Sequence, residues 1–271
     1  MSEAALEQRA AAGTMTDERA KSSGSDALRH IFTIAKREVS GYFASPVAYV
    51  FIVIFLLLSG FLTFMVGGFF ERGQANLLPF FAWHPWLYLF LVPAVGMRMW
   101  SEERRLGTIE LLLTMPITPW QAIVGKFLAS WLILAFALAL TFPLIITVNY
   151  LGHPDNGVIL AGYIGSLLLA GAYLSIAAMT SAMTRNQVVS FILSLVLCLF
   201  LILAGWPPVT DLLTQWASPW FVESIANFSV MTHFEGLQQG VLDSRDVLYF
   251  LSVILFSLFT TSVILRAHRA G

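Results

Sequence analysis

The chain has 271 residues, of which 58% are hydrophobic and 11% are charged, and its mean hydropathy is +0.77. A soluble core of this size cannot hide so much apolar surface, so the composition predicts an integral membrane protein. The formal net charge of −1 argues against nucleic-acid binding, which requires clustered Lys and Arg. A single cysteine, Cys198, excludes an internal disulfide and a cysteine-rich metal site.

The first 25 residues are small, polar and charged, without an apolar block. Residues 1–25 therefore lack the pattern of a signal peptide, and we predict that they form a disordered cytoplasmic tail. Apolar residues then recur at helical spacing over residues 28–42, with Lys36 and Arg37 on another face. This pattern predicts an amphipathic helix in the membrane interface, its basic face toward anionic headgroups. A soluble surface helix is the alternative.

Six apolar stretches are long enough to cross about 30 Å of hydrocarbon, which takes roughly 20 helical residues. In the second stretch Pro85 and Pro93 predict kinks. In the fourth, Gly162, Ser166 and Ala170 lie four residues apart and predict close helix packing. The six stretches are Val47 to Phe70, Phe80 to Met99, Trp120 to Tyr150, Val158 to Met183, Val188 to Gly205 and Val247 to Leu265.

Basic residues set the expected orientation, because short translocated loops are depleted of Lys and Arg. With the N-terminus inside, only Arg72 and Arg245 of the 15 Lys and Arg fall outside the cytoplasmic set. Both ends of the chain are therefore expected in the cytoplasm, with residues 266–271 as a C-terminal tail. An aromatic girdle is expected at the external interface, made of Trp83, Trp86, Trp206, Trp216 and Trp220.

The connection over residues 206–246 is long but rich in apolar residues, and Pro207 and Pro219 interrupt it. This pattern predicts one or two short helices that dip into the outer leaflet and return, which would bury the apolar groups. Asp243 or Ser244 is expected to cap the last span.

The most informative segment, residues 99–121, carries five ionisable groups within nine positions between two apolar stretches. Gly107 ends one helix, Thr108 caps a short second helix and Pro116 stops it. A capping box beginning at Thr118 starts the next span. The segment predicts a short helix held flat beneath the membrane and suited to meeting another protein. The five groups are Glu102, Glu103, Arg104, Arg105 and Glu110.

Few ionisable residues lie in the predicted spans, whereas an ion-coupled carrier normally needs them near the midplane. Arg98 is expected to snorkel to the interface, and His84 and His153 are expected at the external surface. Sodium held by backbone carbonyls keeps a carrier open as an alternative. The chain also lacks the zinc-helix, nucleophile-elbow and P-loop motifs. We therefore expect no catalytic residue and no cofactor in this chain, and nucleotide chemistry would require a separate subunit.

These features together resemble the permease subunit of type-2 ABC exporters. The resemblance covers residues 26–265 and is carried by Glu-Glu-Arg-Arg-x-Gly-Thr-x-Glu-Leu-Leu-Leu-x-x-Pro at residues 102–116. The pattern at residues 229–249 is similar to permeases of the gliding-motility type and, more distantly, to the permease of nitrous-oxide-reductase maturation. The resemblance implies an all-α membrane domain of six transmembrane helices. It also implies the amphipathic N-terminal helix, a cytoplasmic coupling helix between spans 2 and 3, and re-entrant external helices between spans 5 and 6.

By the same resemblance, two permeases, identical or paralogous, would dock on two cytosolic ATPase subunits at a bacterial inner membrane. ATP and magnesium would belong to the ATPase, and the coupling helix would receive its force. Alternatively, the hairpin charges only orient the loop and satisfy the positive-inside bias. The implied coupling residues are Glu102, Glu103, Arg104, Arg105, Gly107, Thr108, Glu110 and Pro116.

An external polar cluster is predicted at residues 233–246, where it would meet a partner such as a protein with a large periplasmic domain. A metal site is the alternative, but one histidine with carboxylates gives too few ligands, and we expect no metal. The sequence indicates no particular substrate or direction of transport, and a force-transmitting membrane scaffold is the second functional hypothesis. The cluster consists of His233, Phe234, Glu235, Asp243 and Asp246.

Overall fold

The computed structural model describes residues 27–108 and 118–267, and within these ranges it contains helices and no strand. The all-α prediction is therefore confirmed for the described part. Residues 27–44 are helical and precede the first membrane helix. The remaining elements are α2 (Pro46–Phe61), the π-helical turn η1 (Leu62–Val66), α3 (Leu78–Phe81), α4 (His84–Gly96), α5 (Arg98–Leu106), α7 (Pro119–Ala139), α8 (Phe142–Leu151), α9 (Asn156–Met183), α10 (Gln187–Leu203), α11 (Pro207–Thr214), α12 (Pro219–Ala226), α13 (Val230–Gln238) and α14 (Ser244–Ala267).

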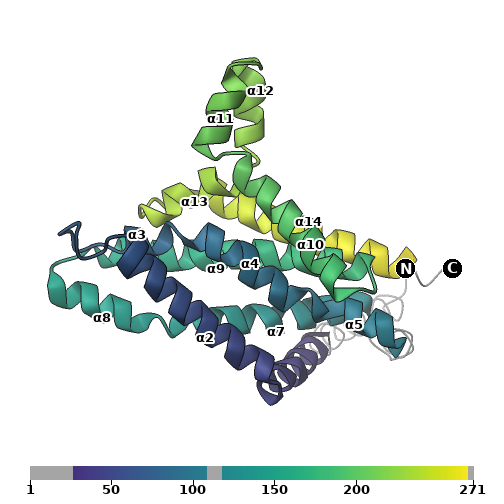
Figure 1. Cartoon of the computed structure of the whole chain (residues 1–271). Coiled ribbons are helices and arrows are strands. Elements are labelled where there is room, and N and C mark those ends of the chain that lie inside the picture. The colour runs from purple at the N-terminus through teal and green to yellow at the C-terminus, as the bar shows by residue number, and fades with distance from the viewer. Residues whose placement is uncertain (1–26, 109–117, 268–271) are drawn as a thin grey trace, which may run out of the picture.

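Helix α9 lies at the centre of the bundle and contacts α4, α5, α7, α10, α13 and α14 (Figure 1). Its small residues allow this close packing. A Cβ atom added to Gly162 would lie 2.5 Å from Phe81 Cε2, and Ser166 and Ala170 are almost fully buried. The packing predicted from the four-residue spacing is confirmed, and α9 is the element through which the other helices meet.

Four helical segments are long and apolar enough to cross a membrane, and a fifth arises if α10 and α11, bent by 65°, form one span. The predicted count of six is not confirmed, because the second apolar stretch is divided among α3, α4 and α5. Pro85 stands in the first turn of α4, and Pro93 lies inside it. Each proline lacks a backbone N–H, so continuous helical bonding is interrupted near both. The four segments cover residues 48–66, 119–151, 156–183 and 244–267.

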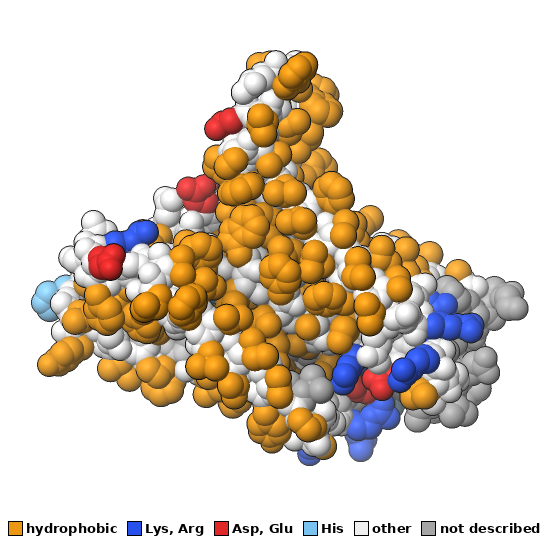
Figure 2. All heavy atoms as spheres, in the orientation of Figure 1, with side chains coloured by type: hydrophobic (Ala, Val, Ile, Leu, Met, Phe, Trp, Pro, Cys, Tyr) orange, Lys and Arg blue, Asp and Glu red, His pale blue; other side chains and the backbone are white. Residues whose placement is uncertain are grey.

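Apolar side chains cover much of the face of the bundle seen in Figure 2, and on this face Lys and Arg gather mainly near α5. Leu57 on α2, Phe200 on α10 and Phe256 on α14 are each more than 60% exposed. Such an outer surface is stable only against lipid or another apolar surface. Together with the long apolar helices, it is the surface of a multi-pass membrane protein.

The helical residues 27–44 place members of the predicted apolar face in two different environments. Ala35 is buried toward the bundle, whereas Leu28 and Phe32 are about 70% exposed. This helix packs on α7 at Gly125, where an added Cβ would lie 2.8 Å from Ile34 Cγ2. The predicted tail over residues 1–25 lies outside the described residues.

Helices α11 and α12 project from the side of the bundle (Figure 1). The connection contains three short helices, α11, α12 and α13, where one or two were predicted. Trp216 is 90% exposed and Trp220 is 75% exposed, whereas Trp206 packs against Trp86 with ring centroids 5.5 Å apart. The predicted aromatic girdle is thus divided between the bundle and this projecting pair.

The environment of His84 differs from its prediction as an interfacial residue. The side chain is fully buried, and its Nδ1 lies 2.6 Å from the Ser166 hydroxyl on α9. The rings of Phe80 and Tyr88 pack around it. Pairing with Ser166 and these aromatic contacts explain why the histidine lies inside the bundle.

Candidate functional site

The first turn of α5 is fixed by a side chain from another helix. The backbone N–H groups of Trp100 and Ser101 both donate to Ser181 Oγ, each at 3.0 Å. The Ser181 hydroxyl donates in turn to the Met97 carbonyl at 2.9 Å. A helix start leaves N–H groups without intrahelical acceptors, and here α9 supplies the missing cap. Trp100 is fully buried beside this contact.

The end of α5 has the predicted turn. Gly107 adopts a left-handed conformation with φ of +73°, which favours glycine. The Thr108 hydroxyl donates to the Glu103 carbonyl at 3.5 Å, so its observed contact is made back to α5. Glu110, Pro116 and the predicted coupling helix lie outside the described residues. The start of the third span is confirmed: the capping box between Thr118 and Gln121 is present.

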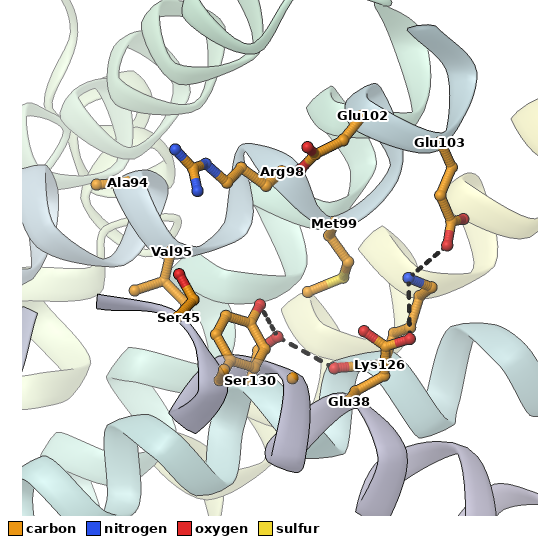
Figure 3. Close-up of a pocket in the computed structure, with 12 residues that line it drawn as sticks. Glu38, Ser45, Ala94, Val95, Arg98, Met99, Glu102, Glu103, Lys126 and Ser130 are labelled. Atoms are coloured by element: carbon orange, nitrogen blue, oxygen red, sulfur yellow. Dashed lines mark hydrogen bonds and ion pairs between the residues drawn. The ribbon is translucent and has the colours of Figure 1, made fainter. Parts of the chain in front are cut away.

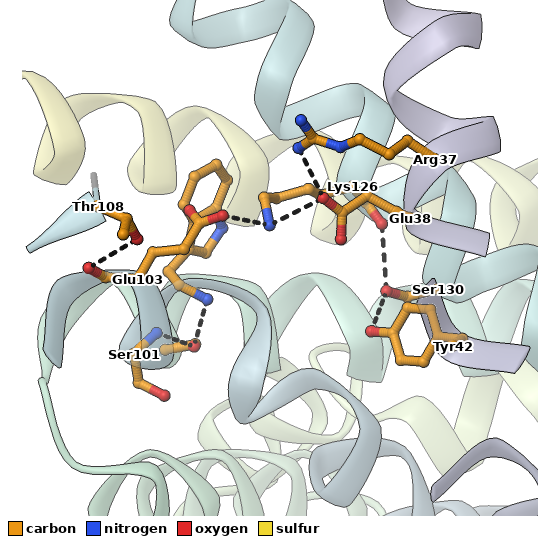
Figure 4. A network of polar contacts seen from close by, with 10 residues as sticks. Arg37, Glu38, Tyr42, Ser101, Glu103, Thr108, Lys126 and Ser130 are labelled. Atoms are coloured by element: carbon orange, nitrogen blue, oxygen red, sulfur yellow. Dashed lines mark hydrogen bonds and ion pairs between the residues drawn. The ribbon is translucent and has the colours of Figure 1, made fainter. Parts of the chain in front are cut away.

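A buried ammonium joins three elements at this end of the bundle (Figure 4). Lys126 Nζ on α7 lies 2.8 Å from Glu103 Oε1 on α5 and 3.4 Å from Glu38 Oε1 on the N-terminal helix. The Lys126 side chain is only 7% exposed, and its ammonium lies 5.4 Å from the centroid of the Trp100 ring. Arg37 approaches Glu38 at 3.1 Å from the solvent side. This ion-pair network links the N-terminal helix, α5 and α7.

Sequence reasoning missed this network and assigned Glu103 only to a contact with a partner. One signal was present: Lys126 is a charged residue inside a predicted span, where a charge is costly unless it is paired. Because its partners are distant in sequence, the spacing alone did not identify them. Glu103 uses one carboxylate oxygen within the chain, so the surface it can offer to a partner is reduced.

A cavity of about 420 Å³ lies beside the network, between the N-terminal helix, α4, α5 and α7 (Figure 3). Tyr42 and Ser130 form part of its wall, with their hydroxyl oxygens 2.9 Å apart. Burial raises the pKa of the Tyr42 phenol, and the Ser130 hydrogen bond only partly opposes this effect. The phenol therefore stays neutral at physiological pH. Arg98, Glu102 and Glu103 line the cavity from α5.

The remaining predicted coupling residues differ in their contacts. Arg104 donates to the Ala182 carbonyl at the end of α9, and burial together with nearby Arg185 lowers its pKa. Arg105 is exposed, and Glu102 is partly exposed at the cavity. Of the described coupling residues, Glu102 and Arg105 therefore present charge toward the outside, whereas Glu103 and Arg104 hold α5 in place.

The predicted external cluster is only partly brought together. His233 Nδ1 lies 2.7 Å from Asp246 Oδ1, and its Nε2 lies 3.1 Å from the Asn227 carbonyl oxygen. The imidazole also stacks on Tyr249, with ring centroids 4.0 Å apart. These contacts connect α13, α14 and the end of the projecting pair.

The other members of the cluster have separate roles. Phe234 is 2% exposed and belongs to the core. The Asp243 carboxylate accepts from the backbone N–H of Arg245 at 2.9 Å at the start of α14. Glu235 accepts from the side chain of Gln239, the residue that follows α13, at 3.5 Å. Within residues 27–108 and 118–267, no three His, Cys, Asp or Glu side chains gather in a metal-binding arrangement.

Comparison with known proteins identifies the family. No curated protein matches the chain. The family model described as "ABC-2 family transporter protein" matches residues 32–231, most of the chain. The matched range contains the Lys126 network, the cavity and the hairpin, and it ends just before His233. A multi-pass helical bundle with this match is a type-2 ABC permease, and the chain belongs to the ABC-2 transporter family.

Proposed function

We propose that this chain is the permease subunit of an ATP-driven exporter, and that a separate cytosolic ABC ATPase acts on it at residues 98–117. ABC-2 permeases generally work with such an ATPase. The observation that carries the proposal is the double anchoring of α5. Ser181 and Arg104 connect it to α9, and Glu103 connects it through Lys126 to α7 and the N-terminal helix.

A displacement of α5 would therefore reach most of the bundle. Helix α9 contacts six other helices, so a force delivered to its end is distributed among them. Such contiguous packing is the physical means by which distant parts of a protein are coupled. In this arrangement Glu102 and Arg105 meet the ATPase together with Glu110, while Glu103 transmits the movement inward.

The assembly follows from the same proposal. Two permeases, identical or paralogous, span a bacterial inner membrane with both termini in the cytoplasm, and ATP and magnesium are bound by the ATPase. The exposed apolar faces of α2, α10 and α14 are available to lipid and to the second permease. An auxiliary protein of the gliding-motility type would meet the α13–α14 region.

The experiment is a pull-down from the source cell with an affinity tag on the full chain, followed by an ATPase assay. We expect an ABC ATPase to co-purify. Combined reversal of Glu102→Lys and Glu110→Lys, which leaves Glu103 and its ion pair intact, is expected to lower ATPase recovery by at least about tenfold, since several charge-assisted contacts are lost. Glu223→Lys on the exposed face of α12 is the matched control. Full recovery with the reversed hairpin would contradict the coupling site.

A force-transmitting scaffold is the second candidate, favoured by the contacts between α13 and α14. His233, Asp246 and Tyr249 fix these two helices where the projecting pair returns to the bundle. A fixed surface of this kind suits a permanent external partner. Reconstitution in vesicles distinguishes the candidates: an exporter moves cargo with its ATPase alone, whereas a scaffold shows ATP hydrolysis that depends on the external partner without cargo movement.

A further inference from the structure

The C-terminal end of α12, at the base of the projecting α11–α12 pair, is held by side chains from the helices that follow it (Figure 1). His233 Nε2 on α13 lies 3.1 Å from the carbonyl oxygen of Asn227, the residue that ends α12. The Thr232 and Tyr249 hydroxyls donate to the carbonyls of the residues before and after Asn227, at 3.0 and 2.6 Å. Carbonyl groups at the end of a helix depend on donors from outside it. These contacts therefore fix the base of the pair to α13 and α14.

His233 differs from the two hydroxyl donors because both of its ring nitrogens face acceptor oxygens. Its Nδ1 lies 2.7 Å from Asp246 Oδ1, and its Nε2 faces the Asn227 carbonyl. An ionised carboxylate and a carbonyl oxygen can only accept hydrogen bonds. A neutral imidazole carries one N–H, whereas both nitrogens of an imidazolium are donors. The two contacts are therefore satisfied together only when the ring is protonated.

The surroundings of His233 favour the protonated ring. The Asp246 carboxylate supplies an opposite charge, and a cation beside the last carbonyls of a helix is stabilised by the helix dipole. The His233 and Asp246 side chains are 17% and 16% exposed, so protons from solution can reach the pair. When the ring loses one proton, the remaining one stays on Nδ1, because an ionised acceptor binds an N–H more strongly than a carbonyl does. The Nε2 lone pair then faces the Asn227 oxygen, and that contact is lost.

Other ionisable groups on the elements around His233 lie in different environments. Helices α9, α10 and α14 pack on α13, and α9 and α10 contain no Lys, Arg, His, Asp or Glu. The titratable groups of α9 and α10 are Tyr163, which pairs with Thr141, and the fully buried Tyr173 and Cys198. The remaining charged side chains of residues 219–246 are exposed: Glu223, Glu235, Asp243 and Arg245. Among the described residues, Asp246 is the carboxylate that pairs with the imidazole.

We propose that His233 is a pH-dependent latch that holds the projecting α11–α12 pair to the bundle. The protonated imidazole binds Asp246 and Asn227 together, so the end of α12 is fixed against α13 and α14. Histidine side chains lose their proton between about pH 5 and 8. As the pH of the surrounding solution rises through this range, the contact with Asn227 is lost and the pair moves more freely. The exposed Trp216 and Trp220 move with it.

The test is hydrogen–deuterium exchange of the full chain in detergent, read by mass spectrometry at about pH 5.5 and about pH 8, on either side of most of this range. Each exchange rate is divided by the intrinsic rate of the same peptide at that pH, and peptides from α9 serve as the internal reference. We expect peptides covering residues 219–229 to be roughly tenfold less protected at the higher pH, the ratio for one charge-assisted hydrogen bond. Equal protection of these peptides at both pH values, relative to α9, would overturn the proposal.

Two variants test the role of the proton itself. In Asp246→Asn the side-chain amide can donate to Nδ1 of His233, so a neutral imidazole keeps its single proton on Nε2 for Asn227. We therefore expect high protection of residues 219–229 at both pH values. His233→Gln cannot be protonated in this range, so it should also remove the pH dependence. A tenfold pH effect that persists in either variant would overturn the proposal, and the unaltered chain decides the case if a variant does not fold.

Two further variants are the controls. Tyr249→Phe removes a hydroxyl that keeps its proton over this range but preserves the ring stacked on His233, so it should lower protection at both pH values and keep their ratio. His153→Gln changes an exposed histidine between α8 and α9 and should keep both protection and ratio. Loss of the pH effect in His153→Gln would assign it to that residue and overturn the proposal. The assay contains no ATPase, so its failure would leave the proposed permease function unaffected.

Discussion

At the α5 end of the bundle, charged and polar side chains from distant parts of the chain bind one another, whereas the α11–α12 pair is bounded mainly by apolar side chains that face outward. Lys126 and Ser181 hold α5 from two directions. In the projecting pair, Trp216 and Trp220 remain exposed, and the polar contacts lie at its base, where Ser229 donates to the Leu201 carbonyl. The first region is fixed internally, and the second depends on lipid or a partner for its environment.

Removal of the buried Lys126 ammonium should have the largest effect on stability, because it disrupts the region that is fixed internally. Lys126→Ala leaves Glu38 and Glu103 without their shared cation in a mostly buried position. Removal of one partner of a buried ion pair costs about 3–5 kcal/mol, so we expect a large fall in the thermal unfolding temperature in detergent. Lys36→Ala, on the exposed face of the N-terminal helix, is the control. A fall as small as that of the control would show that the network adds nothing to stability.

The helix contact at Gly96 gives the next largest effect. A Cβ atom there would lie 2.4 Å from Ala177 Cβ on α9, so Gly96→Ala forces α4 away from its neighbour. Overpacking of this kind costs about 1–3 kcal/mol, measured as a fall in unfolding temperature. Gly60→Ala in α2, which meets nothing within 4 Å, is the matched control and should keep or raise stability. Equal behaviour of the two variants would contradict the close α4–α9 packing.

A smaller effect is expected from the cap that α9 gives to α5. Ser181→Ala removes the acceptor of two backbone N–H groups, and loss of a helix cap costs about 0.5–2 kcal/mol. The rate of limited proteolysis near Arg105 should rise clearly, whereas the unfolding temperature of the whole chain should fall only slightly, because the change is confined to α5. Ser224→Ala, whose hydroxyl donates to the Trp220 carbonyl within α12, serves as the control. Unaltered proteolysis would indicate that α5 is held by its other contacts.

The smallest effect belongs to the projecting pair. Trp216 is 90% exposed, so Trp216→Ser should change the free energy of unfolding in detergent by no more than roughly 0.5 kcal/mol. In a bilayer or in the assembled complex, where an apolar neighbour covers the side chain, the same variant should weaken association. A large destabilisation in detergent would show that the pair is held by the bundle itself, and the contrast between the two regions would be lost.

Local sequence features predicted local structure well. The capping box at Thr118, the left-handed turn at Gly107 and the small-residue packing at Gly162 each depend on neighbouring positions in the chain. The Asp243 prediction was correct for the same reason, because its carboxylate accepts from the N–H of Arg245.

Features that depend on distant residues were not predictable in this way. The pairing of Lys126 with Glu38 and Glu103 requires three elements to meet, and no spacing in the sequence encodes that meeting. His84 was placed at the surface because its neighbours in sequence suggested an interface, yet Ser166 from α9 binds it inside the bundle. The division of the second apolar stretch shows the same limit: its prolines predicted kinks, but not the separation of α5 from α4.

Ser181 on α9, which accepts from two backbone N–H groups of α5, restricts movement of α5 relative to α9. If α5 swung away from α9, the amides of Trp100 and Ser101 would lose their acceptor in a poorly hydrated setting. The two helices are therefore expected to move as one rigid unit. Bending would then occur at Gly107, because the backbone dihedral angles of glycine can change at low cost. If the proposed ATPase acts on the hairpin, the resulting movement would change the angle between the hairpin and the α5–α9 unit at Gly107.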